Sequence, residues 1–141
     1  MNAYDKALYL LSGREHTAKE IRMKLSAKGY GEEEIESAII RLVAEKAIDD
    51  ARYVESYVRS RARKGGESVT LMRMKLLERG VSRDKVDAVL NVYRESDEYF
   101  DCLKKSYQAL SSRKGEEKAL RSLLTKGYTL SEIKRAKEDL N

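Results

Sequence analysis

The chain of 141 residues has no proline and no tryptophan, and it has one cysteine, one histidine and one phenylalanine. One cysteine cannot form a disulfide within the chain, which is typical of a reducing compartment. No run of about 18 apolar residues occurs, so we expect no membrane span and no membrane partner. Residues 1–6 lack the basic start and the apolar stretch of a signal peptide. These absences predict a cytoplasmic protein.

Charged residues make up 38% of the chain, against an average of about 25%. Together with the absence of proline, this composition favours helices that expose wide polar faces to water, and nothing in it indicates a sheet. The formal net charge is +5, and basic residues are densest from Arg59 to Lys85, with nine bases against three acids. Such a stretch favours a polyanionic partner, or a partner that carries a polyanion. A basic face that is only solvated remains the alternative.

A short pattern occurs three times, at residues 25–30, 76–81 and 123–128: a leucine, two spacers, a base, a glycine and an apolar residue. Glycine can adopt the left-handed conformation that ends a helix, and the apolar residue after it would pack on the leucine in a Schellman motif. The pattern therefore predicts a helix end at Gly29, Gly80 and Gly127. A period of about 50 residues is that of a small helical repeat.

Helix-start signals complete these repeats. Thr17 with Glu20, and Thr129 with Glu132, have the capping-box spacing. Further N-caps are expected at Asp49, Ser68 and Ser96. We predict an all-α fold in which three tandem three-helix repeats, residues 1–48, 49–95 and 96–141, stack into an elongated, curved rod.

The short turns at the glycines also resemble a helix-turn-helix. In the first repeat the helix that would enter the major groove begins with Glu32, Glu33 and Glu34, which phosphates would repel. Sequence-specific DNA reading is therefore not expected. Non-specific contact with single- or double-stranded DNA is expected from cations of the second and third repeats, namely Arg73, Lys75, Arg79, Lys134, Arg135 and Lys137.

No constellation of side chains indicates catalysis, a metal or another cofactor. Adjacent aspartates at 49 and 50 could bind a metal, but at a helix start they more often cap the helix, and no third ligand follows at a suitable spacing. His16 has no obvious partner and is expected at the surface or as a capping residue. Cys102 lies in an apolar stripe and is expected to be a small core residue.

Tyrosines gather in the first helix of each repeat. They could be seams between stacked repeats or anchors for a partner, because tyrosine combines a rigid ring with a polar tip. Tyr53 and Tyr57 share a helix with Arg52, Arg59 and Arg63, so this helix could offer both anchors and charge.

Residues 48–53, Ile-Asp-Asp-Ala-Arg-Tyr, resemble the RecX family, bacterial regulators of the RecA recombinase. The similarity continues through residues 57–59, Lys64-Gly65, Leu76 and residues 79–81, and upstream through residues 7–30. The chain departs from the family at two places. Residues 68–72 read Ser-Val-Thr-Leu-Met, where the family often has glycine, proline and a basic-apolar pair, and Lys75 stands where the family usually has a glutamate.

The resemblance implies a non-enzymatic modulator of RecA without a cofactor. Its members lie in the groove of the RecA–single-stranded DNA filament and limit filament growth, ATP hydrolysis and strand exchange. We expect a monomer that contacts the filament through Asp50, Arg52, Tyr53, Tyr57, Arg59, Arg63 and Lys64. Two alternatives stay open: a sequence-tolerant DNA-binding or architectural protein that acts without RecA, and a helical scaffold for another protein.

Overall fold

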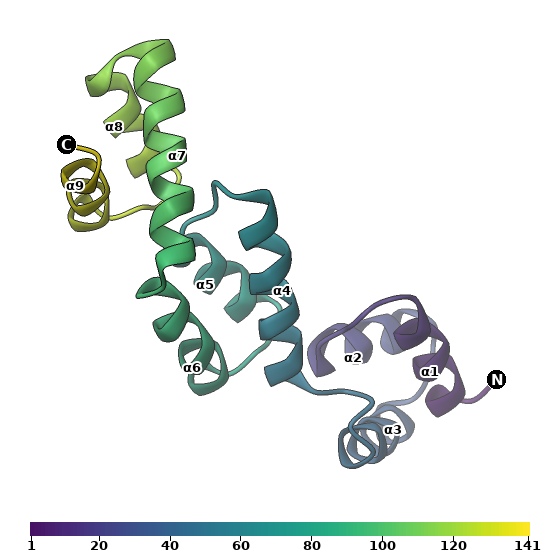
Figure 1. Cartoon of the computed structure of the whole chain (residues 1–141). Helices are drawn as coiled ribbons and strands as arrows, with labels where there is room; N and C mark the ends of the chain where they lie inside the picture. Colours follow the sequence, from purple (N-terminus) through teal and green to yellow (C-terminus); the bar gives the residue numbers. More distant parts are fainter. The chain divides into compact units, whose positions relative to one another are not determined.

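The computed structural model describes residues 1–141 and consists of nine α-helices without strands, which confirms the predicted all-α fold (Figure 1). The helices are α1 (Ala3–Gly13), α2 (Ala18–Ala27), α3 (Glu32–Ala44), α4 (Asp50–Lys64), α5 (Val69–Glu78), α6 (Arg83–Arg94), α7 (Asp97–Lys114), α8 (Glu116–Thr125) and α9 (Leu130–Asp139). None of these helices is both long and apolar enough to cross a membrane.

The three glycine helix ends form as predicted. At the end of α2, Gly29 has a φ of +91°, the Gly29 N–H donates to the Ser26 carbonyl at 3.0 Å, and the Tyr30 N–H donates to the Leu25 carbonyl at 3.3 Å. These two bonds define the Schellman motif. The same pair of bonds recurs at Gly80 and Gly127, whose φ angles are +90° and +97°.

The predicted helix starts are also present. Thr17 and Thr129 each form a complete capping box with the glutamate three residues later. The Asp49 carboxylate accepts from the Arg52 N–H at 3.0 Å, and the Ser68 hydroxyl accepts from the Leu71 N–H at 3.0 Å. Each cap satisfies a backbone donor that the first turn leaves without a helical partner.

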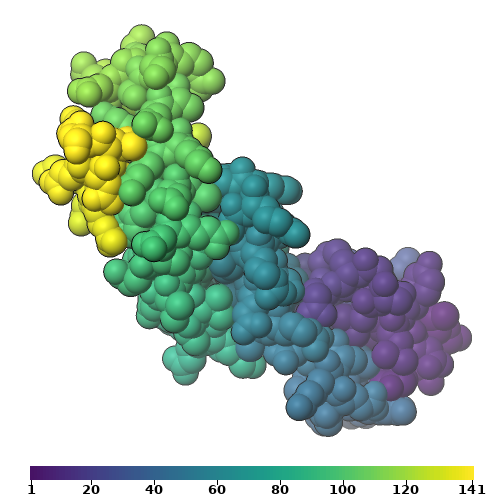
Figure 2. Space-filling view, in the orientation of Figure 1, coloured from purple at the N-terminus to yellow at the C-terminus, as the bar shows by residue number.

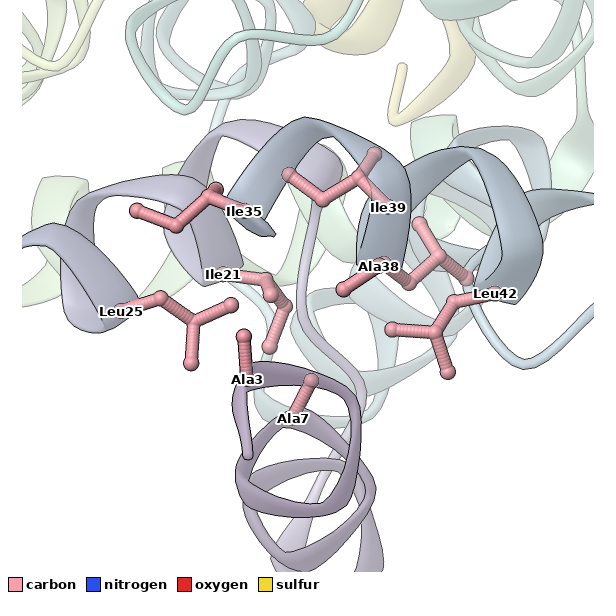
Figure 3. Packing of buried hydrophobic residues seen from close by; sticks show 9 residues of the cluster. Ala3, Ala7, Ile21, Leu25, Ile35, Ala38, Ile39 and Leu42 are labelled. Carbon is pink, nitrogen blue, oxygen red and sulfur yellow. The ribbon is translucent and has the colours of Figure 1, made fainter. Parts of the chain in front are cut away.

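The chain divides into two compact units, which are described separately. The first unit comprises residues 1–55 and 76–86, and the second comprises residues 56–75 and 87–141. In the first unit, Figure 3 shows Ala3 and Ala7 of α1 pointing toward larger side chains of α2 and α3. Ile21, Leu25 and Leu42 are completely buried there, and burial of each such side chain stabilises the fold by about 1.5–3 kcal/mol.

In the first unit the start of α2 contacts the end of α5. The Thr17 hydroxyl, which caps α2, also donates to the Arg79 carbonyl at 2.7 Å. The Lys19 ammonium donates to the Glu78 carbonyl at 3.1 Å. Both acceptors lie in the last residues before Gly80, so carbonyls that the helix end leaves open find donors on another helix.

The second unit contains a matching contact, at the start of α5. The Ser68 hydroxyl, which caps α5, donates to the Lys126 carbonyl at 2.9 Å, directly before Gly127. Tyr99 is buried beside it: its hydroxyl accepts from the Val69 N–H at 3.1 Å, and its ring lies 5.1 Å from the ring of Tyr93. Figure 2 shows α9 directly against α7 in this unit, where buried Leu103 and Ile133 form part of the core.

The expectation that His16 lies at the surface is wrong, because the residue is only 4% exposed. The imidazole lies 2.9 Å from the Arg14 carbonyl through Nδ1 and 2.8 Å from the Lys24 ammonium through Nε2. A neutral ring that donates from Nδ1 and accepts at Nε2 satisfies both neighbours. Burial lowers the pKa of His16, in keeping with that neutral form.

Candidate partner-binding surface

The first turn of α4 is engaged inside the first unit. The Asp50 carboxylate accepts from the Ala18 N–H at 3.1 Å. Arg52 pairs with Glu15 at 2.8 Å and donates to the carbonyls of Lys46 and Ala47 at 2.9 and 3.2 Å. Asp50 thus ties the start of α4 to the start of α2, and Arg52 holds the connection between α3 and α4. Both side chains stabilise the fold.

The two tyrosines of α4 are buried, with exposed fractions of 6% for Tyr53 and 7% for Tyr57. In the first unit the Tyr53 hydroxyl accepts from the Arg79 guanidinium at 2.8 Å. In the second unit the Tyr57 hydroxyl donates to the Glu67 carboxylate at 3.2 Å. Burial raises the pKa of Tyr57, and the negative charge of Glu67 raises it further, so the phenol stays protonated and donates.

Glu67 was not singled out by the sequence, yet it organises the loop between α4 and α5. Its side chain is 10% exposed and also pairs with Lys75 at 2.7 Å and Arg61 at 3.2 Å. Arg61 in turn lies over the Tyr57 ring, 5.0 Å from its centroid. A nearly buried carboxylate is stable only with such partners, and these partners lie in two helices on either side of the loop.

The C-terminal half of α4 carries the cations of this helix that stay available. Arg59, Arg63 and Lys64 are exposed and make no ion pair. Arg59 only reaches the Ser56 hydroxyl on its own helix, at 3.3 Å. Because Arg59 and Arg63 are four residues apart, they lie on the same face of the helix, one turn from each other. We call Arg59, Arg63 and Lys64 the α4 basic surface.

The predicted nucleic-acid contacts of α5 and its end have partners within the chain. Arg73 pairs with Asp87 at 2.9 Å, Lys75 pairs with Glu67, and Arg79 donates to Tyr53. All three side chains are half-buried. A cation already held by a carboxylate gives up that pair when it binds a phosphate, so it contributes less net affinity than a free one.

On α9 the predicted contacts are more exposed but only partly free. Arg135 lies over the Phe100 ring at 3.9 Å and 3.8 Å from Glu95, and Lys137 lies 3.7 Å from Glu116. Lys134 is exposed and has no ion pair. Of the six cations predicted to contact nucleic acid, Lys134 is therefore the one most available to an outside anion.

The alternative of a metal at residues 49–50 gains no support. The two aspartates accept from different backbone N–H groups, those of Arg52 and Ala18. The structure contains no group of three or more histidine, cysteine, aspartate or glutamate side chains arranged to hold an ion.

Two family models match the chain. Residues 3–42 match the first three-helix domain of RecX, and residues 49–90 match the second. The regulatory protein RecX of Vibrio vulnificus (strain CMCP6) is 32% identical, with 99% of this chain and 93% of that protein aligned. The regulatory protein RecX of Prosthecochloris aestuarii is 29% identical, with 98% and 93% aligned.

Solved structures agree with these matches. The crystal structure of RecX from Lactobacillus salivarius superposes with a TM-score of 0.89 at 26% identity, over 98% of this chain and 94% of that one. A second crystal structure of regulatory protein RecX superposes with a TM-score of 0.85 at 27% identity, over 96% of this chain and 70% of that one.

Proposed function

The chain belongs to the RecX family of regulatory proteins, and on that premise we propose that it regulates RecA by binding the filament that RecA forms on single-stranded DNA. Bound there, it limits filament growth and thereby ATP hydrolysis and strand exchange. In this proposal the protein is not an enzyme and acts by binding to the filament, as expected for a regulatory family. It acts in the cytoplasm, where that filament forms.

The α4 basic surface is the observation that carries the proposed contact. The first half of α4 is engaged in contacts within the fold. Arg59 and Arg63, in contrast, project from one face and form no ion pair within the chain. Exposed cations without an ion pair give up no internal salt bridge when they pair with carboxylates or phosphates of a partner. In this proposal Asp50, Arg52, Tyr53 and Tyr57 set the position of the helix, and the α4 basic surface makes the contact.

The test is a titration of RecA's single-strand-dependent ATP hydrolysis with this protein, with its affinity for bare DNA measured alongside. The proposal expects inhibition well below one molecule per RecA, at concentrations where bare DNA stays free. Inhibition that begins only when the DNA itself is coated would instead support the second candidate, a sequence-tolerant DNA-binding protein that acts without RecA. The sequence pI of about 9.2 favours that candidate.

A double charge reversal locates the contact. Arg59→Glu with Arg63→Glu should weaken inhibition at least about tenfold, which corresponds to ~1.4 kcal/mol of binding free energy. The matched control is Lys28→Glu with Lys105→Glu, two exposed lysines without ion pairs on α2's end and α7. Both pairs lower the formal net charge from +5 to +1, so equal losses in the two variants would show a general charge effect and remove the assignment.

A further inference from the structure

The turn between α7 and α8 carries a group of cations that sequence patterns did not single out. An open hollow of about 580 Å3 is lined by four side chains, all of them basic: Arg113, Lys114, Lys118 and Arg121. We call it the α7–α8 hollow. It lies in the second unit, beyond residues 3–42 and 49–90 that the family models match.

Most of this charge has no counter-charge within the chain. Arg113, Lys114 and Lys118 are exposed and form no ion pair. Arg121 is held by Glu117 one turn earlier, at 3.0 Å. The hollow therefore brings three free cations to one place, which sets it apart from the cations of α5 and α9 that have carboxylate partners.

Helix electrostatics explain only part of this arrangement. Arg113 and Lys114 end α7, where positive charge is stabilised by the helix dipole. Lys118 is the third residue of α8, where positive charge is opposed by the dipole, and it adds to the repulsion among its neighbours. An anion bound in the hollow would offset both of these unfavourable effects at Lys118.

The lining also indicates which anion. No aromatic side chain faces the hollow, so it offers no platform on which a base could stack. No carboxylate lines it, and arginine and lysine are the side chains that bind phosphate oxygens. We propose that the α7–α8 hollow binds the phosphodiester backbone of a nucleic acid strand, independently of its sequence.

This inference goes beyond the proposed function, because it concerns contact with the nucleic acid itself and needs no RecA. Phosphate contacts release counterions, so each contact adds a measurable amount to the salt dependence of binding. The test is therefore the affinity of the full chain for a fluorescein-labelled oligothymidylate, measured by anisotropy between 50 and 200 mM salt.

The variant replaces the three free cations: Arg113→Gln, Lys114→Gln and Lys118→Gln. For three lost contacts to a single strand, the slope of log K against log salt should become shallower by about 2. Over the fourfold salt range, the unmodified chain should then lose about 20-fold more affinity than the variant. The matched control replaces Lys28, Lys85 and Lys105 with Gln; it removes the same three charges from exposed, scattered positions and should keep the original slope.

One result of this experiment would support the proposed phosphate site, and two would overturn it. The phosphate site is supported if the slope becomes shallower in the hollow variant alone. A second variant, Lys114→Arg with Lys118→Arg in an otherwise unmodified chain, conserves the charge and should keep the original slope. An equal change in the control variant overturns it, because only net charge would then matter. An unchanged slope in the hollow variant also overturns it, even if that variant no longer inhibits RecA, since the cations would then contact an acidic protein surface.

Discussion

Two glycines with the same backbone conformation should respond differently to the same substitution. Gly29 and Gly80 end α2 and α5 with φ angles of +91° and +90°. A Cβ added at residue 29 meets nothing within 4 Å, whereas one at residue 80 would lie 2.5 Å from the Cβ of Lys19 and 2.6 Å from its Cδ. The pair therefore separates the cost of the backbone conformation from the cost of packing α2 against the end of α5.

The conformational cost is common to both positions. A left-handed alanine costs about 1–2 kcal/mol, and the lower entropy of the unfolded alanine chain offsets about 0.4–1 kcal/mol. Gly29→Ala should thus destabilise by about 1 kcal/mol. Gly80→Ala adds an overpacking cost of about 1–3 kcal/mol, because the Lys19 Cβ is fixed to its helix and cannot turn away.

Urea denaturation of the two variants, followed by far-ultraviolet circular dichroism, measures the difference. Gly80→Ala should unfold at a lower urea concentration than Gly29→Ala, with a free-energy gap of about 1–3 kcal/mol. Equal midpoints with equal slopes would refute the packing argument, since an added Cβ meets Lys19 at residue 80 and nothing within 4 Å at residue 29. A Gly29→Ala variant as stable as the parent would refute the conformational argument as well.

Three further predictions follow from buried groups. Ser68→Ala removes a cap and leaves the Lys126 carbonyl without its donor; it should lower the unfolding free energy by about 2 kcal/mol, whereas a loss below 0.5 kcal/mol would contradict the double role of this hydroxyl. Leu25→Ala, at a fully buried position, should cost about 2–5 kcal/mol in the same urea assay, and a smaller loss would mean that the site collapses around the cavity. Burial lowers the pKa of His16 in the folded chain. As the pH falls, the imidazole is therefore protonated in the unfolded chain at about pH 6.5, before it is protonated in the folded chain. Stability should therefore be constant above pH 6.5 and fall as pH drops below it toward the folded pKa. Thermal unfolding at pH 7.5 and 5.5 should show this fall in the parent and a smaller one in His16→Gln, and because the chain has one histidine, an equal fall in both would assign it to other groups.

The helix boundaries could be predicted because their causes are local. A Schellman end and a capping box each lie within six residues, so Leu25, Gly29 and Tyr30 or Thr17 and Glu20 carry the whole signal. The contact between helices could not be predicted in this way. The Thr17 hydroxyl and the Arg79 carbonyl are 62 positions apart, and one sequence holds no pairing signal over that distance.

The same limit explains what the sequence missed at the candidate surface. Helical spacing places Tyr57 and Arg59 on different faces of α4, but it does not say which face is covered. Tyr57 is buried because Glu67 and Arg61 close over its hydroxyl and ring. Glu67 itself lies in a loop, where periodicity carries no information, and only the structure shows that three side chains depend on its charge.

Whether a cation already has a carboxylate partner, more than the number of cations, decides where this chain can bind a polyanion. The formal charge of +5 counts Lys75 and Lys118 alike, yet Lys75 is 2.7 Å from Glu67 while Lys118 has no ion pair. Binding a phosphate at Lys75 would expose a nearly buried carboxylate that loses its partner, which opposes binding. At Lys118 the same phosphate would relieve repulsion that the folded chain already carries. The free cations of the α4 basic surface and of the α7–α8 hollow are therefore expected to set the salt dependence of binding, and the density of basic residues along the sequence is a poor guide to it.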